Sequence, residues 1–189
     1  MSSLIGHIAA GATAHAWQPA AARASRASLL ACIALAVAPD VDYLLLWTVH
    51  VRLQPRLTHS IAFGVALALV VWLVLRRVAR RPPPLLPLLA AALSHPVLDV
   101  LVGVHGSPLL WPATPTLFAS PIGLLPSAGR LALGNPLLWR NLALELGVLL
   151  PVFAALLAVR RGVRWQPVVA VPVGALWLAC LAASVSLSR

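Results

Sequence analysis

The chain has 189 residues, of which 61% are hydrophobic and only 10% are charged, and its mean hydropathy is +0.94. A soluble domain of this length needs a larger charged fraction to cover its surface, so the composition excludes an ordinary soluble fold. The net charge of +10 comes from arginines in short segments between apolar stretches, which indicates membrane topology rather than nucleic-acid binding.

Six apolar stretches have the composition of membrane helices, for which about 20 residues suffice. The first is the weakest, because it is short, rich in alanine and contains His7, His15 and Gln18, so it crosses the bilayer, lies in the interface or packs inside the bundle. No repeat or polar linker divides the chain. We therefore predict one all-α domain over residues 1–189, a polytopic membrane helix bundle of about five to six transmembrane helices. The stretches are 4–22, 28–48, 58–76, 85–103, 141–159 and 167–187, with kinks expected at Pro39, Pro96, Pro151 and Pro172.

Arginine counts predict the orientation of this bundle. Nine arginines follow the first, third and fifth stretches, and five lie on the opposite side. Cytoplasmic loops carry the excess of positive charge, so both termini are expected to face outward. The long segment 104–140 then lies at the outer interface, where Trp111 and Trp139 are at home, and is expected to cap a site. The nine are Arg23, Arg26, Arg76, Arg77, Arg80, Arg81, Arg160, Arg161 and Arg164, and the five are Arg52, Arg56, Arg130, Arg140 and Arg189.

All of the acidic residues lie within predicted helices: Asp40, Asp42, Asp99 and Glu145. An ionised carboxylate in hydrocarbon costs several kcal/mol, so such residues are usually paired and functional. Helix rise places the last three of them roughly 6 to 9 Å, and His95 about 12 Å, below the outer ends of their helices. His7 and His59 lie close to those ends. The common depth predicts one site in the outer half of the bilayer.

Histidine with aspartate or glutamate is the usual ligand set for zinc, manganese or iron. His95 and Asp99 are four residues apart and share one face of a helix. Thr58 is expected to cap the third helix and so to hold His59 at its start.

Asp40 and Asp42 would point to nearly opposite sides of a straight helix. Either Pro39 breaks the helix so that both turn inward, or one is a ligand and the other bonds a ligating histidine.

Other polar residues have simpler interpretations. His15, His50 and His105 are expected to be packing residues, as are the cysteines Cys32 and Cys180, whose depths are too different for a disulfide. Glu145 is a ligand, a general base or an orienting group, or else it pairs with Arg140 or Asn141.

The sequence resembles the YdjM-type membrane-bound metal-dependent hydrolases of bacteria and archaea. The resemblance covers roughly residues 1–150 and leaves out the last helix, 167–187. It implies metal binding and an activity distantly like that of zinc-dependent phospholipase C. A His-Arg pair common in the family is replaced by Gln54-Pro55-Arg56, which puts that pair's role in doubt here. The matching pieces are Gly6-His7, Pro39-Asp40-Val41-Asp42, Arg56-Leu57-Thr58-His59-Ser60, Ser94-His95-Pro96-Val97-Leu98-Asp99, Trp111-Pro112 and Glu145.

These features predict a hydrolase that cleaves a phosphoester of a membrane lipid, with one or two divalent ions as cofactor: zinc first, with manganese or iron possible. The enzyme would be a multi-pass protein of the cytoplasmic membrane, with its site facing the outer side and with no nucleic-acid partner. Asp40 or Glu145 would act as general base, and Arg56 and Trp111 would bind substrate. The expected metal ligands are His7, Asp40, Asp42, His59, His95 and Asp99, and Thr58, Ser60 and Ser94 are expected to orient them.

Two other classes of function fit the same residues. A divalent-metal or proton transporter or channel also carries intramembrane His and Asp, but it needs polar groups through the inner half of the membrane, where this chain has almost none. A non-catalytic scaffold would use a closed metal site only to tie helices together. Serine-nucleophile chemistry is disfavoured, because neither Ser60 nor Ser94 lies in a nucleophile elbow.

Overall fold

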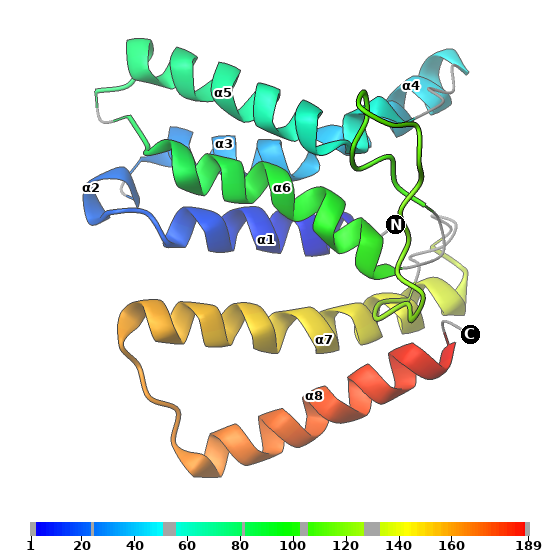
Figure 1. Ribbon diagram of the computed structural model, residues 1–189. Helices are drawn as coiled ribbons and strands as arrows, with labels where there is room; N and C mark the ends of the chain where they lie inside the picture. The colour runs from blue at the N-terminus through cyan, green and yellow to red at the C-terminus, as the bar shows by residue number, and fades with distance from the viewer. Residues whose placement is uncertain are drawn as a thin grey trace. The chain divides into compact units, whose positions relative to one another are not determined.

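The computed structural model describes residues 3–23, 25–50, 56–80, 82–102, 106–126 and 133–187. These residues form helices, with a long connection between α6 and α7 and a single isolated β-bridge in the described part, between Ser107 and Phe118 (Figure 1). The all-α prediction is confirmed. Several residues used above lie outside the described residues: Arg52, Gln54, Pro55, Arg81, His105, Arg130 and Arg189.

Four of the described helices are long and apolar enough to cross a membrane, namely α5, α6, α7 and α8. Their bounds agree with the predicted stretches within a few residues, except that α7 begins earlier than expected. Asn135 caps α7 by accepting a bond from the Leu137 backbone N–H, and Pro136 fits the first turn, where no N–H is needed. The helices are α1 Leu4–Ala16, α2 Ala20–Arg23, α3 Arg26–Val37, α4 Val41–Val49, α5 Ile61–Val78, α6 Leu85–Val102, α7 Pro136–Arg161 and α8 Pro167–Leu187, with 3₁₀ turns η1 Ala38–Asp40 and η2 Leu57–His59.

The predicted first stretch, 4–22, is not one helix. α1 ends at Ala16, and the short α2 follows from Ala20. Pro19 follows Gln18 at this break, and a proline disfavours helical geometry in the residue before it. Gln18 instead turns inward, where its side chain accepts a 2.8 Å bond from Ser28 and donates a 3.3 Å bond to the Cys32 sulfur.

The helix breaks at Pro39, which was one of the two alternatives left open by the sequence. α3 ends at Val37, the turn η1 carries Pro39 and Asp40, and α4 begins at Val41. Proline has no N–H to donate, so the α-helical hydrogen-bond ladder cannot continue through this position. Pro96, Pro151 and Pro172, in contrast, lie inside α6, α7 and α8, which continue past them.

The chain divides into two compact units, whose boundaries fall inside α1 and α6. The first unit comprises Met1–Gly6, Leu98–His105 and Ala119–Arg189. In it, α7 packs on α8, where Gly147 faces Cys180 and the Trp177 indole donates a 3.0 Å bond to the Val148 carbonyl. Ser184 of α8 also holds the Leu124 carbonyl at 2.8 Å.

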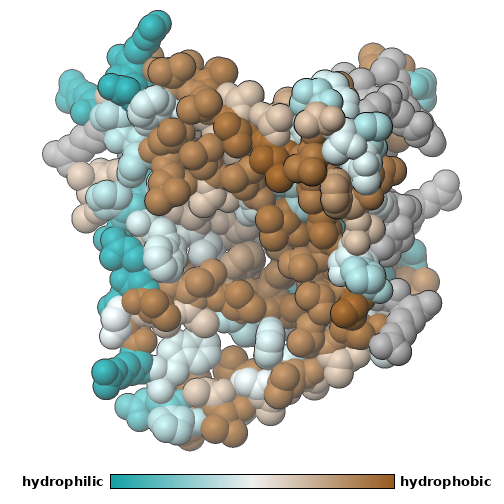
Figure 2. All heavy atoms as spheres, in the orientation of Figure 1, coloured by the Kyte–Doolittle hydropathy of each residue, from teal (hydrophilic) through white to brown (hydrophobic). Residues whose placement is uncertain are grey.

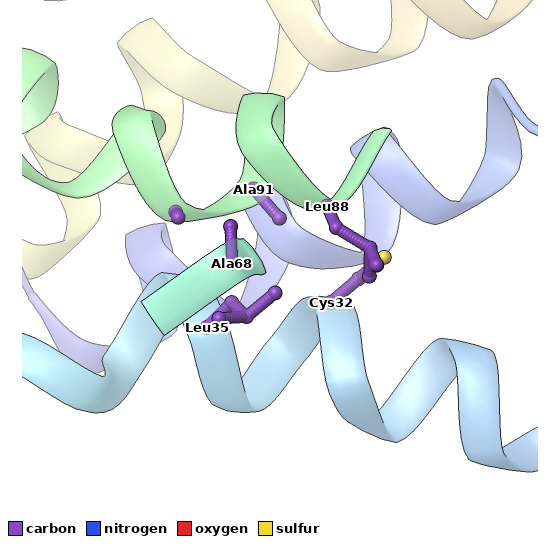
Figure 3. Packing of buried hydrophobic residues seen from close by; sticks show 6 residues of the cluster. Cys32, Leu35, Ala68, Leu88 and Ala91 are labelled. Carbon is purple, nitrogen blue, oxygen red and sulfur yellow. The ribbon is translucent and has the colours of Figure 1, made fainter. Parts of the chain in front are cut away.

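The second unit comprises His7–Val97 and Gly106–Phe118. Its core joins α3, α5 and α6, and Figure 3 shows Cys32 and Leu88 meeting side by side within it. Small side chains dominate this core and let helix backbones approach closely, as is usual in membrane bundles. Both cysteines are free, which agrees with their predicted role in packing. The core residues are Cys32, Leu35, Ala68, Leu88, Ala91 and Ala92.

The exposed face of α5 is apolar over most of its length, and hydrophilic residues gather at its C-terminal end (Figure 2). Val70, Leu73 and Val74 on this helix are each more than half exposed. Apolar side chains directed outward along a whole helix fit contact with lipid rather than water.

Gly11 tests the close packing of α1 on α3. A Cβ at this position would lie 2.7 Å from the Cys32 carbonyl oxygen and 2.9 Å from the Ile33 Cα, and backbone atoms cannot move aside cheaply. Gly11→Ala should therefore destabilise the protein by about 1–3 kcal/mol, measured by thermal unfolding in detergent. Gly174→Ala is the matched control, because its Cβ would meet nothing within 4 Å, and it should be neutral or slightly stabilising. A Gly11→Ala protein as stable as the control would contradict this packing.

Candidate metal centre

Asp40 and Asp42 lie in the second unit, at the break between α3 and α4. Asp40 ends η1 and Asp42 lies in the first turn of α4, with side chains 14% and 6% exposed. The turn η1 packs against η2, which brings both carboxylates near His59. The broken helix thus turns both aspartates inward, as one of the two sequence interpretations requires.

His59 closes η2 and is buried, just before α5 begins. The prediction that Thr58 caps α5 is wrong: Ser60 has the extended backbone of an N-cap, and its hydroxyl accepts the Phe63 N–H at 3.1 Å. Thr58 lies within η2, and its hydroxyl is 3.0 Å from His59 Nδ1. It therefore orients the imidazole directly rather than through the helix.

His95 projects from the middle of α6 and is completely buried. Its Nδ1 lies 2.8 Å from the Ala36 carbonyl oxygen, and because a carbonyl only accepts, Nδ1 carries the proton. The other nitrogen, Nε2, faces Asp40 Oδ1 at 3.8 Å. A donor bond from one ring nitrogen to a carbonyl is the usual way a metal-binding histidine is fixed.

His7 lies in the second turn of α1, and its ring stacks on that of His95 with centroids 3.9 Å apart. Its Nε2 is 4.0 Å from Asp40 Oδ2. His59 meets His95 edge-on at 4.8 Å. Three imidazoles from α1, η2 and α6 thus surround the one carboxylate of Asp40.

The group formed by Asp40, His59 and His95 fits a divalent metal. Each offers one ligand atom, and the three atoms lie within 4.8 Å of one another. Asp40 Oδ1 is 3.8 Å from Nε2 of both histidines, too far for hydrogen bonds but close to the roughly 3.3 Å that separates two ligands of a tetrahedral zinc. This oxygen is buried and has no hydrogen-bond partner among the described residues. A bound cation would satisfy this oxygen, which otherwise costs free energy as a buried, unpaired polar atom.

Asp42 has a different partner. Arg56 donates to both of its oxygens, from Nε at 2.6 Å and from Nη2 at 3.1 Å. The same Nη2 lies 2.7 Å from His59 Nε2. The guanidinium therefore joins the carboxylate of Asp42 to the metal-facing nitrogen of His59.

Asp99 and Glu145, also predicted as site residues, belong to the first unit. Asp99 is buried near the end of α6, four residues after His95. Glu145 is fully buried in α7, and both of its oxygens accept the Ser3 backbone N–H, at 2.7 and 2.9 Å. Ser3 in turn accepts the Gly6 N–H at the start of α1, so Glu145 anchors this end of the helix.

The remaining predicted residues have local roles in the structure. Ser94 donates to the Ala91 carbonyl of its own helix at 2.7 Å, and Trp111 is half-buried in the loop of the second unit. His15 is buried, and His50 is exposed in the left-handed conformation that ends α4.

Sequence reasoning missed the Ala36 carbonyl. Pro39 could have indicated it, because this proline ends α3 and the last carbonyls of a helix have no partner within the helix.

Apolar helices of membrane-spanning length and a buried His/Asp cluster define an integral membrane protein with a candidate metal centre. A family model described as YdjM inner membrane protein matches residues 1–187, so the chain belongs to this family. No curated protein and no solved structure matches the chain.

Proposed function

We propose that the protein is a membrane-embedded, metal-dependent hydrolase that cleaves a phosphoester of a lipid on the outer side of the membrane. The observation that carries this proposal is the convergence of His59 and His95 on the buried, unsatisfied oxygen of Asp40. Three protein ligands with a fourth position open is the pattern of catalytic zinc sites, whereas structural zinc sites are closed by four. The three ligand atoms grouped at Asp40, His59 and His95 match the catalytic number and support an enzyme, whereas His7 on the same ion would give the four ligands of a scaffold.

His59 and His95 would hold the ion through Nε2, and Asp40 would hold it through its carboxylate. When bound, zinc, or in its place manganese or iron, supplies Lewis acidity toward the phosphoryl oxygen and the attacking water. The Ala36 carbonyl keeps His95 in the tautomer that leaves Nε2 basic. The Arg56 N–H that donates to His59 Nε2 requires the same tautomer of His59, whose Nδ1 proton the Thr58 hydroxyl can accept.

Asp40 is better placed than Glu145 to take a proton from the attacking water. Its two oxygens are directed differently: Oδ1 faces the two Nε2 atoms, and Oδ2 faces His7. Glu145 has both of its oxygens engaged by the Ser3 N–H. A general base needs an accepting oxygen within reach of the water, which favours Asp40.

Arg56 is the candidate for binding the phosphate. Its side chain is 29% exposed, whereas those of His59 and His95 are 1% and 0% exposed, so it lies nearest the solvent side of the cluster. The planar guanidinium binds phosphate through paired hydrogen bonds. A site at roughly headgroup depth favours a phospholipid as the source of that phosphate.

Metal content tests the centre. Purified wild-type protein should hold stoichiometric metal, and His59→Ala or His95→Ala should weaken zinc binding at least about a hundredfold, because loss of an orienting group alone costs 10- to 100-fold. His50→Asn is the matched control, since His50 is exposed and asparagine tolerates its positive φ of 55°. Wild-type protein without stoichiometric metal would remove the basis of the proposal.

Arg56→Ala tests phosphate binding. The variant should lose about ten- to a hundredfold in phospholipid turnover, the worth of a hydrogen bond to a charged group, while its metal content at saturating zinc stays at the wild-type level. Turnover of a phospholipid in mixed micelles measures the effect. Equal turnover in the two proteins would exclude Arg56 from the mechanism.

Cysteine labelling in intact cells tests the outward orientation. Thr116 and Arg164 are exposed in connections expected on opposite sides of the membrane. A membrane-impermeant maleimide should label Thr116→Cys from outside, and Arg164→Cys only after permeabilisation. The parent protein gives the background, since Cys32 is buried and Cys180 is half-buried. The reverse pattern would place the site on the cytoplasmic side.

A further inference from the structure

The Nε2 atom of His59 has two candidate partners of positive charge, the Arg56 guanidinium and a bound metal ion. His59 Nε2 lies 3.8 Å from Asp40 Oδ1, so it is the ring nitrogen that faces the Asp40–His59–His95 group, and Arg56 Nη2 lies 2.7 Å from it. A guanidinium has no acceptor, so in this contact the imidazole lone pair accepts an Arg56 N–H. The same lone pair binds a metal, and it can serve one of the two at a time.

The rest of the Arg56 side chain is held independently of His59. Its Nε donates to Asp42 Oδ2 at 2.6 Å, while Nη2 is shared between Asp42 Oδ1 at 3.1 Å and His59. The Nε contact is therefore a tether about which the terminal nitrogens can turn. A turn that gives up His59 keeps the ion pair with Asp42.

We propose that Arg56 and the divalent metal compete for His59 Nε2, so that metal binding frees the terminal guanidinium nitrogen for the anionic phosphate of the substrate. This inference rests on the proposed function and adds an order to it: the ion displaces Arg56 from His59, and Arg56 then presents its donor to the substrate.

Electrostatics favours the same relation. The carboxylates of Asp40 and Asp42 and the guanidinium of Arg56 lie around one imidazole. A cation already in the group repels an incoming ion, and like charges a few ångströms apart interact strongly in a site shielded from water. A phosphate that draws Arg56 away raises the metal affinity, and by reciprocity the metal raises the phosphate affinity.

A purely supporting role for Arg56 predicts the opposite change in metal affinity. If Arg56 only supports His59, its removal leaves the imidazole less well oriented and weakens metal binding. The two accounts predict changes of opposite sign, so affinity for zinc alone separates them without any measurement of activity.

The experiment titrates zinc against a competing chelator in the full-length, detergent-solubilised protein. Arg56→Gln should bind zinc roughly tenfold or more tightly than wild type, a change of about 1.4 kcal/mol. Arg56→Lys should shift the affinity in the same direction by less, because it keeps the charge but loses the fork. Asp42→Asn should weaken binding, because it removes a carboxylate and leaves the guanidinium on His59.

Arg76→Gln is the matched control for the loss of one positive charge, since Arg76 lies over the Trp72 ring at the other end of α5, and it should leave the affinity unchanged. Equal or weaker binding by Arg56→Gln overturns the proposal. If that variant does not fold, Arg56→Lys decides by the same criterion. A wild-type protein that binds no zinc would instead reject the proposed function, so the two failures are distinguishable.

Discussion

The cost of burying charge in an apolar chain is the constraint on which this structure depends. The protein has only four acidic residues, and the three with described partners are each compensated in a different way. Asp42 is paired with Arg56, Glu145 accepts a backbone N–H from Ser3, and Asp40 faces the imidazoles of His59 and His95. Among these three, Asp40 alone keeps a buried oxygen without a hydrogen bond in the described part of the chain, and a bound cation would compensate its charge.

Pro39 links the fold to this centre. It ends α3, so the side chains of Asp40 and Asp42 both point inward. The Ala36 carbonyl, at the end of this helix, is then available to accept a hydrogen bond from His95. One break in the helix thus supplies both the carboxylate and the group that fixes the tautomer of a facing histidine. Small residues in the core, with Gly11 against Cys32, let the helices come close enough for these short side chains to meet.

The sequence predicts the long apolar helices well, because length and hydropathy alone determine them: 85–103 and 167–187 match α6 and α8 almost residue for residue. It also anticipates that Asp40, His59 and His95 converge, since all three fall in the outer half of their predicted helices. It does not predict what depends on backbone groups of distant segments, such as the bond from Ser3 to Glu145 or from His95 to Ala36. Nor does it predict that Arg56, assigned to substrate from its loop position, is already bonded to Asp42.

The central claim is that one metal ion is held by histidine nitrogens and the Asp40 carboxylate. X-ray absorption spectroscopy of the zinc-loaded protein tests it most directly. The account predicts only nitrogen and oxygen ligands, at about 2.0–2.1 Å, with the multiple scattering of at least two imidazoles. Sulfur ligands at about 2.3 Å, which only cysteine or methionine could supply, or a shell without imidazole, would contradict it.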